Sequence, residues 1–362
     1  MRYKLKDIFD LQMGKTPSRN KLDYWNTEDY KWISIADLTK TGKYISKTKE
    51  YLSEKAVKES QIKVIPANTV IMSFKLSIGK VAITVEDMYS NEAIMAFHDK
   101  HVVEILPEYI YYLFKYKNWE EGINKAVMGK TLNKATLSDV EIEIHPIEEQ
   151  QLIVDVLDKM MELLEGRETE LVLLDDLIKA RFVEMFGDPR LNEKGFKCKR
   201  GYELFKISNG KTVSNEKRFE SGIPAYGGNG ISWYTNTALF EEDTIVIGRV
   251  GFQSGNVHFV KGPMWITDNA MYISELYDDS LSLIFLCDMM EQIDFTRNQD
   301  AGDLKKVTQK PFMEMKYILP EKSLQKEYVD FVHQIDKSKA VIKKALDETQ
   351  TLFDSLMQQY FG

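Results

Sequence analysis

Two long segments carry apolar residues at alternating steps of three and four, the spacing that lines one seam of an α-helix. The first segment, 148–186, contains no proline and only one interior glycine, Gly166. Its seam holds Ile153, Leu157, Met160, Leu164, Arg167, Leu171, Leu174, Ile178, Arg181 and Met185. A pattern sustained over this length favours a coiled-coil helix. The alternative is an ordinary helix that packs on one compact domain.

The second segment lies at the C-terminal end of the sequence. Its seam holds Tyr328, Phe331, Ile335, Ser338, Ile342, Ala345, Thr349, Leu352 and Leu356. Both segments end at Phe-Gly, and Gly187 stands before Pro189, which is typical of a helix stop. Each helix of about 38 residues would be about 57 Å long at 1.5 Å per residue. Antiparallel pairing of the two helices would bury both seams.

A stretch of mixed β-type and helical pattern precedes each long helix. The predicted strands are Tyr30–Ile35, Thr69–Met72, Val81–Val85, Thr244–Ile247 and Val257–Val260, with a helix near Pro107–Tyr116. The predicted fold is α+β, with two mixed α/β domains at 1–146 and 188–320 separated by paired helices at 147–187 and 321–362.

The chain also repeats itself at an offset of about 175 residues. The matched pairs are Gly14-Lys15-Thr16 with Gly210-Lys211-Thr212, Thr69–Met72 with Thr244–Ile247, Gly79–Val81 with Gly255–Val257, Tyr109–Leu113 with Ser282–Leu286, Gly129 with Gly302, and Phe186-Gly187 with Phe361-Gly362. Two copies of so long a period predict an internal duplication with approximate two-fold symmetry. A target with two halves, of which DNA is the commonest, suits such a protein.

The net charge of −8 argues against a nucleic-acid binder, but its distribution softens the objection. Residues 1–144 hold 22 Lys and Arg against 20 Asp and Glu, whereas 145–187 hold 4 against 11. Most of the negative excess therefore lies on the first long helix. A nearly neutral domain should bind DNA weakly by itself, and a partner with basic surface would strengthen the complex.

Motifs for bond-making chemistry are incomplete. The nearest match to an adenine methyltransferase loop, Asp188-Pro189-Arg190, lacks the second proline and the aromatic residue. Both Gly-Lys-Thr sites lack the earlier glycine of a phosphate-binding loop. His98 and His101 are three residues apart, but no carboxylate or Cys cluster completes a metal site with them, and Cys198 and Cys287 are too few for a metal cage or disulfide framework. We expect no catalysis, no metal and no cofactor.

The order of these elements resembles the DNA-specificity subunit of type I restriction-modification systems, over essentially the whole chain. The matching stretches are 129–150 (GKTLNKATLSDVEIEIHPIEEQ), 222–230 (GIPAYGGNG) and 244–257 (TIVIGRVGFQSGNV). The entry to the first long helix, Leu-Ser-Asp followed by Pro-Ile-Glu-Glu-Gln, is the most specific signal. Its second copy, 320–325 (PEKSLQ), is degraded.

The resemblance implies two target-recognition domains that each read a few base pairs, with the paired helices as a ruler between them. It also implies two methyltransferase subunits docked on those helices, and restriction subunits that join through them. A non-DNA adaptor with two binding domains on a helical spacer is the alternative, and a self-sufficient modification enzyme a third. The chain has no signal peptide or membrane-spanning pattern, so we expect it in the cytoplasm.

Candidate DNA contacts are polar or basic residues beside glycines, where the backbone can approach a phosphate closely. They are Lys15, Thr16, Ser18, Arg19, Lys75 and Lys80 in the first domain, and Lys211, Thr212, Tyr226, Asn229, Arg249 and Gln253 in the second. Arg249 follows an apolar strand and is the strongest candidate. The Gly-rich turns are alternatively plain hairpins, and we expect the lysine- and tyrosine-rich run 40–51 to form an exposed hairpin.

Overall fold

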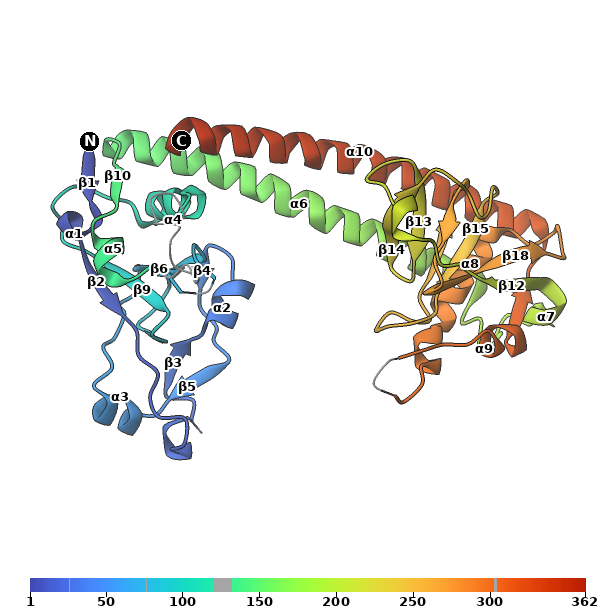
Figure 1. Cartoon of the computed structure of the whole chain (residues 1–362), viewed down its shortest axis with the longest axis horizontal. Coiled ribbons are helices and arrows are strands. Elements are labelled where there is room, and N and C mark those ends of the chain that lie inside the picture. Colours follow the sequence, from blue (N-terminus) through green and yellow to red (C-terminus); the bar gives the residue numbers. More distant parts are fainter. Residues whose placement is uncertain (26, 76, 120–131, 303–304) are drawn as a thin grey trace. The chain divides into compact units, whose positions relative to one another are not determined.

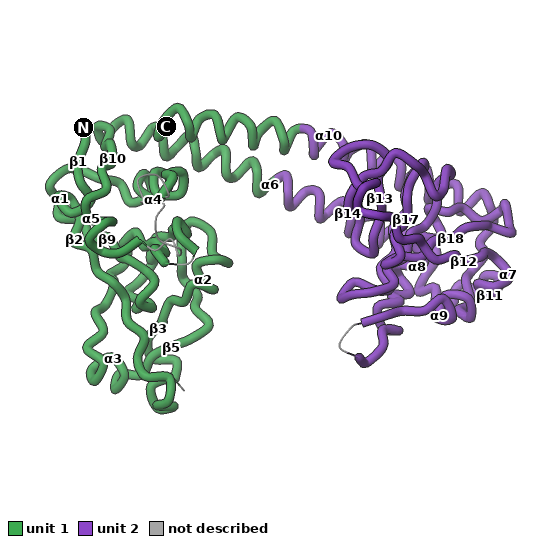
Figure 2. The backbone as a smooth tube through the Cα atoms, viewed as in Figure 1, with its two compact units in different colours: residues 1–166, 345–362 green, residues 167–344 purple. Residues whose placement is uncertain are grey.

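The computed structural model describes residues 1–25, 27–75, 77–119, 132–302 and 305–362, so that Gly129 of the expected repeat lies outside the described residues. The chain divides into two compact units, residues 1–166 with 345–362 and residues 167–344 (Figure 2). Each unit contains one globular part and about half of each long helix. In the described part of the chain, no helix is long and apolar enough to cross a membrane.

The globular part of unit 1 is built on a five-stranded sheet in the order β2-β9-β6-β7-β4, with smaller sheets β5-β3-β8 and β1-β10 (Figure 1). Its elements are β1 (Arg2–Lys4), α1 (Leu5–Ile8), β2 (Phe9–Met13), β3 (Tyr30–Ile33), α2 (Ile35–Lys40), β4 (Tyr44–Ile45), β5 (Glu50–Leu52), α3 (Glu54–Ser60), β6 (Val70–Ser73), β7 (Val81–Thr84), β8 (Tyr89–Ser90), β9 (Ile94–Asp99), α4 (Pro107–Tyr116), α5 (Lys134–Ser138) and β10 (Glu141–Glu143).

The central strands of this sheet are apolar at successive positions because both of their faces are buried. Met72 and Ile83 pack in one core that includes helix α4, whereas Ile71 and Ala82 pack in a second core on the other face. Run 40–51 does not form the hairpin that its composition suggested. Strand β4 pairs in parallel with β7, and β5 pairs with β3, so the two strands join different sheets.

Unit 2 repeats this topology, which confirms the internal duplication. Its sheet β12-β18-β15-β16 follows the order of β2-β9-β6-β7, and the parallel pair β13·β17 repeats β3·β8. Its elements are β11 (Lys197–Arg200), α7 (Gly201–Leu204), β12 (Phe205–Asn209), β13 (Ile223–Gly227), β14 (Gly230–Thr235), β15 (Thr244–Gly248), β16 (Val257–Val260), β17 (Trp265–Ile266), β18 (Ala270–Leu276), α8 (Leu283–Ile293), α9 (Lys310–Glu314) and β19 (Lys316–Leu319).

A buried glutamine near the start of each long helix fixes the alignment of the copies. The backbone N–H of Leu106, which precedes α4, donates to Oε1 of Gln150 at 2.9 Å, and that of Ser282, which precedes α8, donates to Oε1 of Gln325 at 3.0 Å. The repeat match that paired Tyr109 with Ser282 is therefore wrong by three residues. The degraded helix entry of the second copy nevertheless keeps this contact.

The long helices are α6 (Ile147–Phe186) and α10 (Lys322–Phe361), and they pair antiparallel within each unit. In unit 1, Leu157 of α6 shares a buried cluster with Phe353 and Met357 near the end of α10. In unit 2, Phe182 near the end of α6 packs edge-on against Tyr328 near the start of α10. The predicted coiled-coil pairing is confirmed, and all ten seam positions of α6 are buried or half-buried.

The seam predicted for α10 is wrong at two positions, Ser338 and Leu352, whose side chains are exposed. Lys339 and Phe353 take these places. The ammonium of Lys339 pairs with Asp175 of α6 at 2.5 Å. Residues 337–339 are Lys-Ser-Lys, so hydrophobicity could not decide which of them faces the partner helix.

Candidate nucleic-acid interface

A glycine at the end of strand β12 starts the candidate site of unit 2. The N–H of Gly210 donates to the carbonyl of Ala270 (3.0 Å), and that of Lys211 to the carbonyl of Ile266 (2.8 Å). A Cβ at position 210 would lie 2.0 Å from the carbonyl oxygen of Thr267, so only glycine fits. The first part of the Gly-Lys-Thr motif is thus explained by backbone packing, while the side chains of Lys211 and Thr212 are exposed.

The same turn recurs in unit 1. Gly14 donates to the carbonyl of Ile94 (3.1 Å) and Lys15 to that of Ser90 (2.8 Å). A Cβ at Gly14 would lie 2.2 Å from the carbonyl oxygen of Asn91. The match between the two Gly-Lys-Thr motifs is therefore structural as well as sequential.

Two further glycine turns of unit 2 lie beside Gly210. Ala270 pairs with Gly248 at the end of β15 and also accepts the bond from Gly210, so both strand ends lie at one end of the sheet. Gly228, in the β13–β14 turn, packs against Gly248, since a Cβ added there would be 3.1 Å from its Cα. This turn is a β-hairpin, as the alternative interpretation of the Gly-rich turns had it, and it exposes Asn229. Tyr226 is half-buried, and this burial raises its pKa.

Arg249 opens the loop between β15 and β16. Its N–H donates to the carbonyl of Asn269 at 2.9 Å, while its guanidinium is exposed and, among the residues that the structure describes, reaches only the carbonyl of Asp268, at 3.4 Å. Such a long bond contributes little and leaves most of the guanidinium donors open to a ligand. Gln253, near the end of the same loop, is half-buried.

Two lysines that sequence reasoning missed complete the site of unit 2. The backbone of Lys305 accepts a hydrogen bond from Gly251 (2.8 Å), and Lys306 forms a β-bridge with Val250. Among the described residues, no ion pair involves Lys211, Lys305 or Lys306. The sequence feature that could have indicated them is the Lys-Lys pair shortly after Gly302, in a segment with no strand pattern. The structure therefore gathers three lysines, Arg249 and two side-chain amides at one sheet end.

The predicted residues of unit 1 also lie around the end of their sheet, but their charged groups have partners. Lys15 donates to the carbonyl of Ser60 (2.6 Å) and Lys80 to Oγ1 of Thr39 (2.5 Å). The guanidinium of Arg19 pairs with both oxygens of Glu50 and stacks 3.8 Å from the ring of Trp25. The remaining contacts join Thr16 to Glu92, the Ser18 carbonyl to the Trp25 indole and Lys75 to the Phe74 ring. Arg19 must release Glu50 before those guanidinium donors can contact a phosphate, whereas the ammonium groups of Lys15 and Lys80 each have two further N–H donors.

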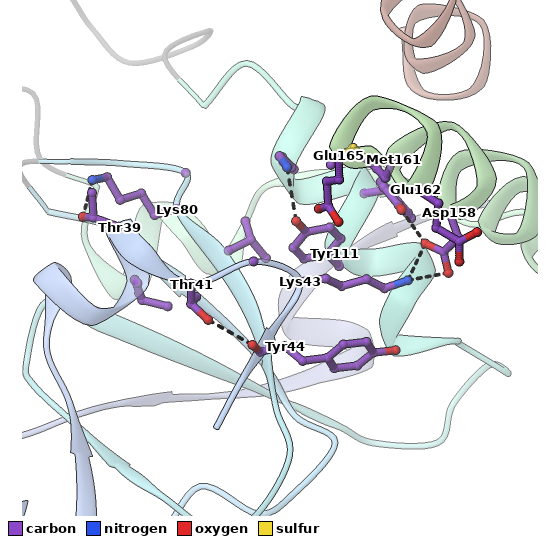
Figure 3. Close-up of a pocket in the computed structure, with 16 residues that line it drawn as sticks. Thr39, Thr41, Lys43, Tyr44, Lys80, Tyr111, Asp158, Met161, Glu162 and Glu165 are labelled. Carbon is purple, nitrogen blue, oxygen red and sulfur yellow. Dashed lines mark hydrogen bonds and ion pairs between the residues drawn. The ribbon is translucent and has the colours of Figure 1, made fainter. Parts of the chain in front are cut away.

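A groove of about 470 Å³ in unit 1 lies between the sheet, helix α4 and helix α6 (Figure 3). The ammonium of Lys43 pairs with both oxygens of Asp158 on α6, at 2.6 and 2.7 Å. Tyr112 of α4 also donates to Asp158, and burial and this carboxylate both raise the pKa of its hydroxyl. This network locks α4 and the sheet onto the long helix, and sequence reasoning did not find it.

Within the described ranges, no cluster of three or more His, Cys, Asp or Glu side chains could hold a metal ion. His101 pairs with Asp99, and His98 is half-buried on β9 with its pKa lowered by burial. The geometry offers strand-end loops with positive charge and amide groups, which is chemistry for binding a polyanion.

The sequence matches the family described as the type I restriction modification DNA specificity domain over residues 1–173 and 193–350. It is 32% identical to the type I restriction enzyme MjaIX specificity subunit of Methanocaldococcus jannaschii over 58% of this chain and 52% of that one. It is 25% identical to the EcoprrI specificity subunit of Escherichia coli over 75% of this chain and 71% of that one.

Two solved structures share the fold over the whole chain. The specificity subunit from M. genitalium superposes with a TM-score of 0.58 at 18% identity and is covered over 96% of its length. A chain from a structural study of complex assembly and conformational transition in the type I restriction-modification system superposes with a TM-score of 0.62 at 16% identity and is covered over 97%. The family match, the duplicated topology and the paired helices agree, and the chain belongs to the type I restriction-modification DNA specificity family.

Proposed function

We propose that this chain is the non-catalytic DNA-binding subunit of a type I restriction-modification complex and reads a bipartite target. The observation that carries the proposal is the duplication: each unit presents a Gly-Lys turn and a β-hairpin loop at the same end of an equivalent sheet. In unit 2 this end gathers Lys211, Arg249, Lys305 and Lys306. Two similar readers in one chain suit two half-sites on one duplex, roughly one helical turn apart.

The recognition domains in this proposal are residues 1–146 and 188–320, with helical spacers at 147–187 and 321–362. Two methyltransferase subunits would dock on the spacer helices, and restriction subunits would join through them. Apolar side chains exposed on α6, at Val172, Leu173 and Leu177, support a protein-binding role for this helix. Its acidic composition is unfavourable for contact with DNA and compatible with contact with a basic protein.

The test is co-expression with a type I methyltransferase subunit from the same genome, followed by purification and mapping of methylated adenines. The proposal expects a stable complex whose methylation is confined to a motif of two short specific halves around a non-specific spacer. The chain alone, supplied with S-adenosylmethionine, should methylate nothing. Robust methylation by the chain alone would overturn the non-catalytic role.

The adaptor alternative predicts a complex with protein partners and no DNA binding. Titration of a fluorescent duplex with the assembled complex at two salt concentrations separates the two. Binding that weakens steeply with salt supports phosphate contacts by the basic strand-end loops. Absence of binding at low salt in the presence of the partner would favour the adaptor.

A further inference from the structure

Phe252 is the most exposed large apolar side chain in the part of the chain that the structure describes, at 89% of its full surface. It lies at the tip of the β15–β16 loop of unit 2, three residues after Arg249. A phenylalanine in water carries a large apolar surface whose burial against a ligand is favourable. An aromatic ring exposed in this way is typical of a surface that a ligand covers.

The loop that exposes the Phe252 ring has an ordered backbone, held by hydrogen bonds. The side-chain amide of Gln299 donates to the carbonyl of Phe252 (2.9 Å) and to that of Ser254 (2.7 Å). Within the loop, Ser254 donates to the carbonyl of Gly251 at 3.0 Å, and Gly251 donates to that of Lys305. The loop therefore holds the ring outside the fold, and a ligand that covers it meets a pre-ordered side chain with little conformational entropy to lose.

The surroundings of the ring select nucleic acid as the occupant. Arg249 is exposed on the same loop, and Lys305 and Lys306 are joined to this loop by backbone bonds. An apolar ring surrounded by cations matches a duplex, in which phosphates flank the grooves and the bases present apolar faces and thymine methyl groups. Apolar side chains that enter a groove contact such methyl groups or wedge between neighbouring bases.

We propose that Phe252 is an apolar contact to the bases of the half-site that unit 2 reads. The inference rests on the proposed function and deepens it, because it assigns part of the sequence reading to a side chain with no hydrogen-bonding group. Arg249 and the lysines position the loop on the backbone, and the ring senses the base that it covers. Loss of the ring then relaxes one position of one half-site.

The experiment uses the assembled complex with its methyltransferase subunits and duplexes that carry the mapped motif. Phe252→Ala should weaken binding at least tenfold and make one position of a single half-site degenerate. The affinity of Phe252→Leu should lie between those of the wild type and Phe252→Ala. The control is Leu191→Ala, which removes an apolar side chain of the same unit that is 67% exposed and far from the loop in sequence. It should leave binding and motif unchanged, and all variants should keep the same unfolding midpoint.

Two modified duplexes identify the base contact. If the ring packs on a methyl group, replacement of thymine by uracil at the degenerate position weakens binding by the wild-type complex and not by Phe252→Ala. If it wedges between bases, 2-aminopurine placed there becomes brighter on binding the wild-type complex and not the variant. If Phe252→Ala binds as tightly as the wild type and its motif is unchanged, this inference is overturned and the proposed function is not. The same holds if Phe252→Ala binds more weakly but neither the uracil nor the 2-aminopurine duplex gives the expected difference. If the wild-type complex binds duplexes with and without the split motif equally, the proposed function is overturned as well.

Discussion

The indole Nε1–H of Trp265 donates a hydrogen bond to the carbonyl oxygen of Lys211 at 2.9 Å. In unit 1 the indole of Trp32 makes the same bond to the carbonyl of Lys15 at 3.1 Å. The two tryptophans come from different strands, β17 and β3, which do not correspond in the repeat. Both copies therefore use an indole to hold the lysine of the Gly-Lys-Thr turn, although the sequence supplies it from different positions.

Trp265→Phe should weaken reading of one half-site and leave the other intact. The change keeps an aromatic ring but leaves the Lys211 carbonyl without its donor, which costs about 1 kcal/mol and lets the turn move. We expect a three- to tenfold loss of affinity, measured by fluorescence anisotropy of the complex on its motif. Trp32→Phe is the matched variant and should affect the other half-site. Equal damage to both halves by either variant would reject this positioning role.

Gly210→Ala should destabilise the protein by about 2 kcal/mol or more, because the new Cβ would overlap the Thr267 carbonyl at 2.0 Å. Gly302→Ala is the control, since no atom of the described residues beyond its chain neighbours lies within 4 Å of a Cβ at that position. Urea unfolding monitored by circular dichroism measures both. A midpoint for Gly210→Ala equal to that of Gly302→Ala would contradict the close approach.

Gln150→Ala should cost about 2 to 3 kcal/mol of stability, because it leaves buried backbone groups without partners. The Gln150 amide accepts from Leu106 and donates to the carbonyls of Glu104 and His145 at 2.9 and 2.8 Å. Its neighbour Gln151 is exposed, and its side-chain amide donates to Oδ1 of Asp155 on the helix surface, so Gln151→Ala should change stability by less than about 0.5 kcal/mol. Similar midpoints for the two variants in thermal unfolding would refute the buried contact.

Asp288 should make the protein less stable as the pH rises from about 4 to about 7. Burial raises its pKa from 3.8 to about 7, even though Tyr328 donates a hydrogen bond to it at 2.7 Å. Between these values the folded state binds the proton more tightly than the unfolded chain, so the free energy of unfolding falls with rising pH. Asp288→Asn should remove this slope and stabilise the protein at pH 8 by roughly 2 kcal/mol, about half of what the pKa shift alone allows.

Asp278 provides a control of opposite sign. Lys199 and Ser280 lower its pKa to about 2, so its contribution to stability is present above pH 4 and is lost as the pH falls toward 2. Asp278→Asn should therefore destabilise the protein at pH 7, where Asp288→Asn stabilises it. Chemical unfolding across pH 4 to 8 gives both results, and the same sign for the two variants would contradict the assignment.

Local periodicity was enough to predict the helices and several strands. Helix α4 lies at Pro107–Tyr116, where a helix was predicted, strand Val257–Val260 has the predicted ends, and α6 begins one residue before the first residue of its predicted segment. The pairing of the strands could not be predicted, because the hydrophobic pattern of a short strand such as β4 does not indicate which strand it pairs with. The parallel pairings β3·β8 and β13·β17 depend on long connections that sequence pattern does not specify.

The candidate site was predicted in part. Glycines with a neighbouring lysine or arginine pointed to the Gly210 turn and the Arg249 loop, and both lie at one end of the sheet. The sequence could not indicate that Arg19 is held by Glu50, since 31 residues separate them. Lys305 was missed because its place beside Gly251 comes from tertiary packing alone.

The most direct test of two independent readers in one chain is adenine methylation mapping of the complex with the wild-type chain and with Arg249→Ala. The account predicts a split motif for the wild type, and for the variant a motif that becomes degenerate or lost in one half while the other half stays unchanged. A continuous motif, or equal relaxation of both halves by Arg249→Ala, would contradict it.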